Sequence, residues 1–197
     1  RQSDGARQMT MLRRLPKILR FVLGAAQALR ASFLSLQYWL ARSDENIANL
    51  VRHLVGRFAD GPRAALRGKV KADMPVEYPE VGVYHPRMKG RITDQPNRLP
   101  GKKNTRGTVG LLVMRSYVLA GNTGHYDGVI DALEARGFKV IPAFASGLDA
   151  RPAVEQFFFK GGKPCVDAVV SLTGFSLVGG PAYNDAAAAQ EVLADLD

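Results

Sequence analysis

The sequence predicts a protein of the α/β class. Three short apolar runs, at residues 110–114, 139–144 and 166–172, have the composition of strands buried in a sheet. Each run is followed by a loop rich in Gly, Ser or Asn and then by a helical pattern. Strands that alternate with helices pair in parallel, because each right-handed crossover returns the chain to the same edge. We therefore predict an incomplete Rossmann-like parallel sheet of three strand–helix units, preceded by a mainly helical region.

The chain divides by composition into three segments. We predict a basic helical region at 1–60, a basic connector rich in Pro and Gly at 61–108, and the Rossmann-like domain at 109–197. Residues 1–108 contain 21 Lys or Arg against 8 Asp or Glu, whereas residues 109–197 contain 6 against 10. The net charge of +9 therefore comes from the first two segments. The single cysteine, Cys165, excludes an internal disulfide bond and a zinc site built from cysteines.

Residues 12–42 are apolar with basic residues at intervals. The longest run without a charge, 31–41, is shorter than the ~20 residues of a membrane-spanning helix. Two interpretations stay open: a basic amphipathic helix on a membrane surface, or helices packed in a core, which an amphipathic stripe ordinarily indicates. In the second, the large apolar side chains face inward; they are Phe33, Leu36, Tyr38, Trp39 and Leu40.

A second helix is expected to begin after Ser43 and to run to about Phe58. Ser43 is a good N-cap, with Asn46 three residues later in place of the usual Glu. His53 falls between the apolar positions of this helix, so we expect it to be exposed or internally hydrogen-bonded rather than a metal ligand.

The connector contains no recognisable nucleotide site. Gly61, Gly68 and Lys69 suggest a phosphate-binding loop, but six residues separate the glycines instead of four, and Val70 replaces the required Ser or Thr. The sequence therefore predicts no ATP hydrolysis by that route.

The rest of the connector has one strand candidate, at residues 81–84, and a basic patch that includes Lys102, Lys103 and Arg106. A surface that binds nucleic acid usually has aromatic residues among its basic ones, and none lies between Tyr84 and Tyr117. We therefore expect a solvated connector or an interface to another domain, and no nucleic-acid partner.

Candidate ligand-binding residues lie in the loops after the strands, because ligands of open α/β sheets bind outside the carboxyl ends of the strands. In the first loop, Arg115 and the helix start at 122–124 form a candidate anion pocket, His125 and Asp127 are a candidate base and metal ligand, and Tyr126 is a candidate stacking face. Asn122 and Thr123 can equally be ordinary helix caps, and Arg115 an ordinary surface charge.

The third loop, at 172–184, is the other candidate. Its glycines allow a ligand to approach the backbone, and Phe175 and Tyr183 offer apolar walls. The alternative is a glycine-rich crossing that ends in Asn184 as the N-cap of the last helix.

Long stretches of the chain closely resemble one known family. These are MRSYVLAGNTGHYDGVIDALEARGFKVIPAFASGLDARPAVEQFF, VDAVVSLTGFSLVGGPAYNDAAAAQEVL, SLQYWLARSDENIANLVRHLVGRF and YHPRMKGRI. They are similar to the large, porphyrin-binding H subunits of magnesium chelatases. The large subunits of cobaltochelatases are similar to the same family, but RSYVLAGNTGHYDGVI resembles the magnesium branch more closely.

The resemblance implies an activity. Magnesium chelatases insert Mg²⁺ into protoporphyrin IX, which leads to chlorophyll and bacteriochlorophyll, and two partner subunits of the I and D type, similar to AAA+ ATPases, hydrolyse the ATP. It implies a cytoplasmic protein with peripheral contact at photosynthetic membranes. The candidate residues for porphyrin are Arg115, Asn122, Thr123, His125, Tyr126, Phe175 and Tyr183, with His125 as a base and Asp127 as a metal ligand.

We expect this chain to be a fragment of a longer protein and to be inactive alone. It begins without Met and ends after the third helix, where a parallel sheet takes its next strand. The family's insertion residues are then expected to lie downstream of Asp197. Two other functions stay open: a cobaltochelatase large subunit acting on a corrin precursor, and a scaffold whose basic half docks a partner or a membrane.

Overall fold

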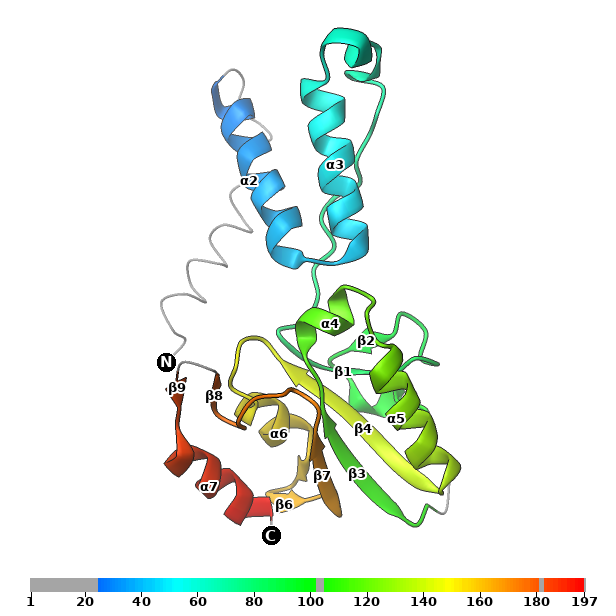
Figure 1. Cartoon of the computed structure of the whole chain (residues 1–197), viewed down its shortest axis with the longest axis vertical. Helices are drawn as coiled ribbons and strands as arrows, with labels where there is room; N and C mark the ends of the chain where they lie inside the picture. The colour runs from blue at the N-terminus through cyan, green and yellow to red at the C-terminus, as the bar shows by residue number, and fades with distance from the viewer. Residues whose placement is uncertain (1–24, 102–104, 181–182, 197) are drawn as a thin grey trace. The chain divides into compact units, whose positions relative to one another are not determined.

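The computed structural model describes residues 25–101, 105–180 and 183–196, and the chain forms two compact units, Arg1–Glu77 and Tyr78–Asp197. Figure 1 shows both units, which we describe separately. The predicted helical stretch at 12–24, and Lys102 and Lys103 of the predicted basic patch, lie outside the described residues.

Two helices and a short 3₁₀ turn form the described part of the first unit. They are α2 (Ala25–Ala41), α3 (Asp44–Phe58) and η1 (Gly61–Leu66). The predicted N-cap of α3 is confirmed: the Ser43 hydroxyl accepts hydrogen bonds from the backbone N–H and the side-chain amide of Asn46, at 3.1 and 2.8 Å. A cap of this kind satisfies donors that the helix itself leaves unpaired.

The inward face of α2 differs from the predicted one. Ala31, Leu34 and Tyr38 are buried, which fits one face of a helix with 3.6 residues per turn. Trp39 is 58% exposed and Leu36 is 37% exposed, so the expectation that both face inward is wrong. Apolarity alone did not separate Tyr38 from Trp39, because neighbouring residues of a helix point about 100° apart.

Two asparagines of α3 hydrogen-bond to the backbone of residues 73–76, the segment that follows η1 and runs back along this helix. The Asn46 amide pairs with Val76 in both directions, with distances of 2.9 Å to the Val76 carbonyl oxygen and from the Val76 N–H. The Asn49 carbonyl oxygen accepts a hydrogen bond from the Asp73 N–H at 3.2 Å, and the Tyr38 hydroxyl donates to the Asp73 carbonyl oxygen. Both asparagines are fully buried, so their side chains replace water for this backbone segment.

The second unit contains a five-stranded sheet in the order β2-β1-β4-β3-β7 (Figure 1). Its strands are β1 (Val81–Tyr84), β2 (Ile92–Thr93), β3 (Gly107–Leu112), β4 (Phe138–Ala145) and β7 (Ala168–Ser171). β3 is parallel to both β4 and β7, which confirms the three parallel strands predicted from the sequence. The sheet is mixed, because β1 runs antiparallel to β4 and to β2.

Helices cover both faces of this sheet. On one face, α4 (Arg115–Leu119) and α5 (Gly124–Ala135) pack on a core that contains Leu111, Val140 and Phe144. On the other face, α6 (Arg151–Phe157) and α7 (Ala186–Leu196) pack on a core of the remaining strand residues. The central strands β3 and β4 are therefore buried from both sides, as their apolar runs predict.

Three details differ from the prediction. β7 is an edge strand with three exposed residues, not a buried strand, because no strand among the described residues pairs with its outer side. The segment after β3 begins with the short helix α4, which the sequence analysis treated as loop. The Asp185 carboxylate, not Asn184, caps α7 by accepting a hydrogen bond from the Ala188 N–H at 3.0 Å.

Two small hairpins complete the unit. One pairs β5 (Phe159–Lys160) with β6 (Lys163–Pro164), and the other pairs β8 (Gly179–Gly180) with β9 (Tyr183–Asn184) inside the third loop. The 3₁₀ turn η2 (Pro96–Arg98) lies between β2 and β3.

Candidate functional site

A small pocket lies at the carboxyl ends of the three parallel strands. It is lined by the ends of β3 and β4, by the loop at 147–150, and by Thr173, Phe175 and Ser176 of the third loop. Its cavity volume is about 20 Å³. That volume exceeds what one water molecule needs, about 10–15 Å³, but sites that bury a drug-sized ligand measure roughly 300–1,000 Å³. The pocket can therefore take a small group and not a whole macrocycle.

The charged group at this pocket is neutralised within its own loop. The Asp149 carboxylate accepts hydrogen bonds from the Arg151 backbone N–H at 2.9 Å and from its guanidinium at 2.7 to 3.1 Å. Hydrogen bonds from Arg151 lower the pKa of Asp149 below its ordinary value. Asp149 therefore stays ionised and paired, and it is a poor general acid.

The first predicted cluster does not form one pocket. The Arg115 guanidinium donates hydrogen bonds to the carbonyl oxygens of Pro79 and Tyr78, at 2.9 and 3.3 Å, and so fastens the segment that leads into β1. Tyr126 is buried, and its hydroxyl accepts a hydrogen bond from the Met114 N–H at 3.1 Å. Its ring belongs to the core under α5, and burial raises the pKa of its hydroxyl.

The start of α5 carries the exposed members of this cluster. Asn122 and His125 are exposed, and the His125 ring contacts the rings of Tyr126 and Tyr117, with centroids 3.8 and 5.5 Å apart. Thr123 occupies the N-cap position, but its hydroxyl does not cap the helix. It donates instead to an Asp127 oxygen at 3.2 Å and accepts from Arg91 at 2.9 Å.

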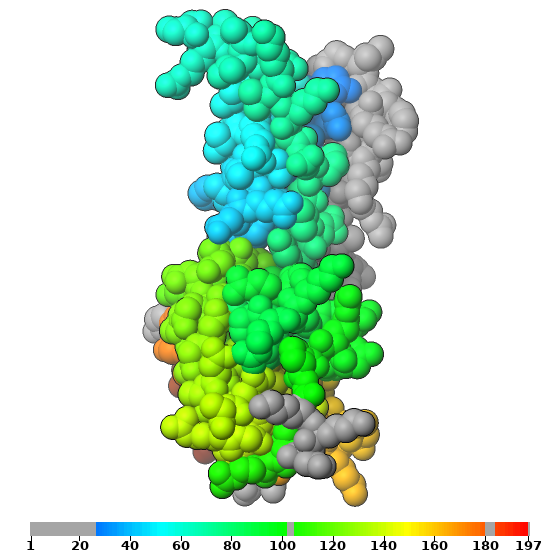
Figure 2. All heavy atoms as spheres, turned by 90° about the vertical axis from the view of Figure 1, so that its right-hand side faces the viewer, coloured from blue at the N-terminus to red at the C-terminus, as the bar shows by residue number. Residues whose placement is uncertain are grey.

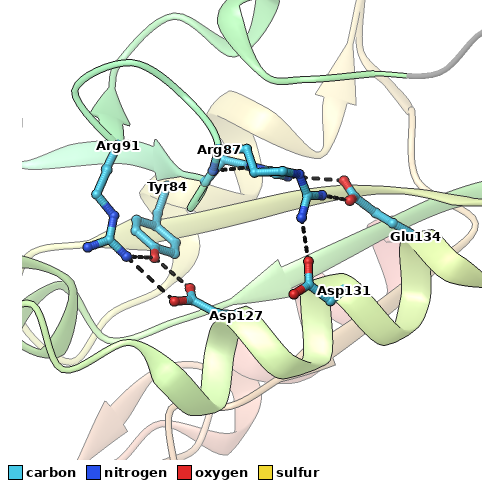
Figure 3. A network of polar contacts seen from close by, with 7 residues as sticks. Tyr84, Arg87, Arg91, Asp127, Asp131 and Glu134 are labelled. Carbon is cyan, nitrogen blue, oxygen red and sulfur yellow. Dashed lines mark hydrogen bonds and ion pairs between the residues drawn. The ribbon is translucent and has the colours of Figure 1, made fainter.

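Asp127 belongs to a polar network between β1, the turn after it, and α5, which we call the β1–α5 network (Figure 3). The Tyr84 hydroxyl donates to one Asp127 oxygen at 2.6 Å, and the Arg91 guanidinium lies 3.5 Å from the other. Arg91 also donates to the Tyr84 hydroxyl and lies over the Tyr84 ring, 5.2 Å from its centroid. Burial and the bond to Asp127 raise the pKa of Tyr84. Both oxygens of the candidate metal ligand therefore already have partners.

The other end of the network joins the same turn to the last turns of α5. Arg87 forms ion pairs with Asp131 and Glu134 (Figure 3). The fully buried His85 contacts a Glu134 oxygen through Nε2 at 3.0 Å. The Arg87 N–H donates to His85 Nδ1 at 3.2 Å, so Nδ1 carries no proton. Burial, and next the charge of Arg87, lower the pKa of His85. His85 is therefore neutral and donates a hydrogen bond to Glu134.

The sequence analysis missed the β1–α5 network. It placed Tyr84, Arg87 and Arg91 in a connector, although the spacing of the two arginines matches the Asp127 and Asp131 spacing on α5. Figure 2 shows the turn and α5 side by side on one surface of the second unit. Arg91 also has a left-handed backbone, with φ +58, which is uncommon for a residue with a side chain.

The two predicted residues of the third loop, Phe175 and Tyr183, are far from the first cluster in the sequence. Phe175 is 37% exposed at the rim of the carboxyl-end pocket. Tyr183 pairs with Gly180 in the β8–β9 hairpin, and its side chain lies outside the described residues. Within the described ranges, no three His, Cys, Asp or Glu side chains lie close enough together to bind a metal ion.

Comparison with known proteins decides the family. A family model described as "CobN/Magnesium Chelatase" matches residues 36–197, which include the whole sheet unit. The chain belongs to the CobN/magnesium chelatase family. This is the family whose motifs the sequence resembles.

Relatives within the CobN/magnesium chelatase family are similar over almost all of this chain. The magnesium-chelatase H subunit of Cereibacter sphaeroides is 56% identical over 195 residues, which are 99% of this chain and 16% of that protein. The chloroplastic magnesium-chelatase ChlH subunit of Oryza sativa subsp. japonica is 38% identical over 204 residues, which are 96% of this chain and 14% of that protein. The chain thus spans about one sixth of the relatives that it matches.

One solved structure shows a looser likeness. The catalytic subunit of cobaltochelatase from Mycobacterium tuberculosis superposes with a TM-score of 0.48 and 21% identity, over 72% of this chain and 10% of that one.

No described helix of the present chain has the length and apolarity to cross a lipid bilayer.

Proposed function

We propose that this chain is part of the porphyrin-binding H subunit of a magnesium chelatase, which inserts Mg²⁺ into protoporphyrin IX. The observation that carries the proposal is the 56% identity to a magnesium-chelatase H subunit across 99% of the chain. Identity at that level over almost the whole chain is much higher than a shared fold alone requires.

The chemistry of the reaction assigns roles to the predicted residues. A base near the ring must accept the pyrrole protons, and the exposed His125 is the candidate in this chain. A ring propionate needs hydrogen-bond donors, which the start of α5 near Asn122 offers. For Asp127 to bind Mg²⁺, Tyr84 and Arg91 would first have to release its oxygens. Phe175, and Tyr183 in the neighbouring hairpin, are the candidates for apolar contact with the ring.

The rest of the reaction belongs to the complete assembly. In this proposal, I-type and D-type AAA+ partner subunits hydrolyse ATP, and Mg²⁺ arrives as a substrate that prefers oxygen ligands. The protein works in the cytoplasm, with peripheral contact at photosynthetic membranes. The chain by itself is inactive.

Reconstitution tests this function. The full-length protein that contains this chain, mixed with its ATPase partners, ATP and Mg²⁺, should convert protoporphyrin IX into its magnesium complex, which porphyrin fluorescence detects. Omission of ATP is the control. Failure to insert magnesium, together with insertion of cobalt into a corrin precursor, would contradict the proposal in favour of a cobaltochelatase. The family model covers both kinds of enzyme.

A scaffold function makes a different prediction for ligand binding. Titration of the full-length protein with protoporphyrin IX should quench its tryptophan and tyrosine fluorescence to saturation if the protein binds porphyrin. Lack of saturable quenching would favour a docking module whose basic helical region contacts a partner.

A further inference from the structure

The rim of the carboxyl-end pocket carries two exposed apolar side chains from different loops. Leu148, from the loop after β4, is 44% exposed, and Phe175, from the loop after β7, is 37% exposed. Both line the pocket. We propose that Leu148 and Phe175 contact one face of the porphyrin ring and that the pocket between them takes one vinyl substituent of that ring. This inference rests on the proposed function and names the part of the substrate that this chain binds.

The size of the pocket limits what can enter it to a small substituent of the ring. A cavity of about 20 Å³ is too small for the ring, so the ring must lie across the rim. The apolar substituents of protoporphyrin IX are methyl and vinyl groups, and the two-carbon vinyl group is the longer one, so it reaches further into such a cavity from a ring on the rim. The flat face of the ring then covers Leu148 and Phe175, and apolar area is removed from water on both sides.

The polar side chains of the pocket have no capacity left for a propionate. Arg151 neutralises the Asp149 carboxylate, and the Ser176 hydroxyl donates to the Val178 carbonyl oxygen at 3.1 Å. The Thr173 hydroxyl accepts from the Phe175 N–H at 3.3 Å and contacts the Ser171 hydroxyl at 3.0 Å. A carboxylate in this pocket would lose its hydrogen bonds to water without gaining a cation as a partner. A vinyl group makes no such hydrogen bonds, so its burial has no comparable cost.

The two loops are joined before any ligand binds. The Gly179 N–H donates to the Leu148 carbonyl oxygen at 2.9 Å, and the Ala150 N–H donates to the Leu177 carbonyl oxygen at 3.0 Å. Asp149 and Val178 form an isolated antiparallel bridge between these bonds. The rim is therefore ordered in advance, which lowers the entropy cost of binding a rigid ring.

Substitution of the two rim residues tests the proposal. In the full-length protein, Leu148→Ala and Phe175→Ala should each weaken protoporphyrin IX binding about 10-fold, measured by fluorescence quenching. Leu193→Ala is the matched control, because Leu193 is an exposed leucine of the same unit that lies on α7 and does not line the pocket. Its affinity should equal that of the unaltered protein. If Leu148→Ala and Phe175→Ala bind protoporphyrin IX as tightly as Leu193→Ala and the unaltered protein do, the proposal is overturned.

A second measurement changes the porphyrin instead of the protein. Deuteroporphyrin IX carries hydrogen in place of both vinyl groups, so the unaltered protein should bind it about 10-fold more weakly than protoporphyrin IX. Leu148→Ala should reduce this difference, because the variant opens the pocket that discriminates the two rings. Equal affinity of the unaltered protein for both porphyrins would overturn the vinyl assignment. Absence of binding to either porphyrin would contradict the proposed function itself.

Discussion

At one position in the central strands, close packing of the neighbouring layer on the sheet allows only a residue without a side chain. This position is Gly110 in β3, where an added Cβ atom would lie 2.7 Å from ring atoms of Phe158. Phe158 is fully buried, so its ring has little freedom to move away. Glycine at this position thus allows the layer on this face to pack closely on β3.

Gly110→Ala should therefore destabilise the protein by about 1–3 kcal/mol, as overpacked cores do. The matched control is Gly128→Ala in α5, where an added Cβ meets nothing within 4 Å. Because alanine favours a helix interior, this control should gain about 0.5–1 kcal/mol. Urea unfolding followed by circular dichroism measures both values. A neutral Gly110→Ala variant would mean that the layers can separate without cost.

Arg91 combines a strained backbone with a charged side chain that reaches α5. Its φ of +58 disfavours any residue with a Cβ atom. Arg91→Gly relieves that strain, whereas Arg91→Ala keeps it, and both remove the guanidinium. We expect Arg91→Ala to be less stable than Arg91→Gly by about 1 kcal/mol in urea unfolding. Equal stability of the two variants would show that the turn relaxes when the guanidinium is gone.

At the scale of elements, the β1–α5 network joins an antiparallel strand and its turn to a helix on one face of the sheet. Its three acidic residues lie on one side of α5, and its two arginines come from one turn (Figure 3). The Arg87–Asp131 ion pair is exposed on both sides, so it contributes little stability. The buried His85 has a lowered pKa, so its titration affects folding at acidic pH.

The stability of this turn should depend on pH through His85. The pKa of His85 is lower in the folded protein, so the unfolded chain binds more protons between that lowered value and about 6.5. The contribution of His85 is therefore complete above about pH 6.5 and decreases as the pH falls towards the lowered pKa.

His85→Gln keeps a donor towards Glu134 but does not titrate. We expect the free energy of unfolding of the native protein to fall more steeply between pH 7 and pH 5 than that of His85→Gln. Chemical unfolding of both proteins at several pH values measures this difference. Because both proteins contain the same carboxylates, the contribution of carboxylate titration largely cancels when the two profiles are subtracted. Parallel pH profiles would contradict a neutral buried His85.

At the scale of the whole molecule, each of the two units has its own compact set of contacts. The first unit depends on Asn46, which donates hydrogen bonds to the Ser43 cap of α3 and pairs with Val76. The second unit depends on the two cores of its sheet. Loss of a contact inside one unit should therefore stay within that unit.

Asn46→Ala leaves the Val76 backbone groups without partners and should cost the helical unit about 1–3 kcal/mol. Amide hydrogen exchange should increase in α3 and at residues 73–76, while exchange in β3 and β4 stays unchanged. Faster exchange in the sheet strands would show that the two units unfold together.

The local features of this protein were predictable from its sequence. The Ser43 cap, the strand at 81–84 and the parallel units around β3 and β4 were predicted, because caps, periodicity and turns act within a few residues. The resemblance to the chelatase family also came from the order of residues alone. Of the candidate site, the sequence indicated which loops meet at the carboxyl ends of the strands.

Only the tertiary structure decided which side chains meet. It paired β1 with β4, buried Tyr126, engaged both oxygens of Asp127, and left Leu148 and Phe175 exposed at one rim. Each of these facts depends on partners tens of residues away in the chain. Periodicity gives the face of a strand or helix but not its neighbour, so the contacts between segments had to come from the fold.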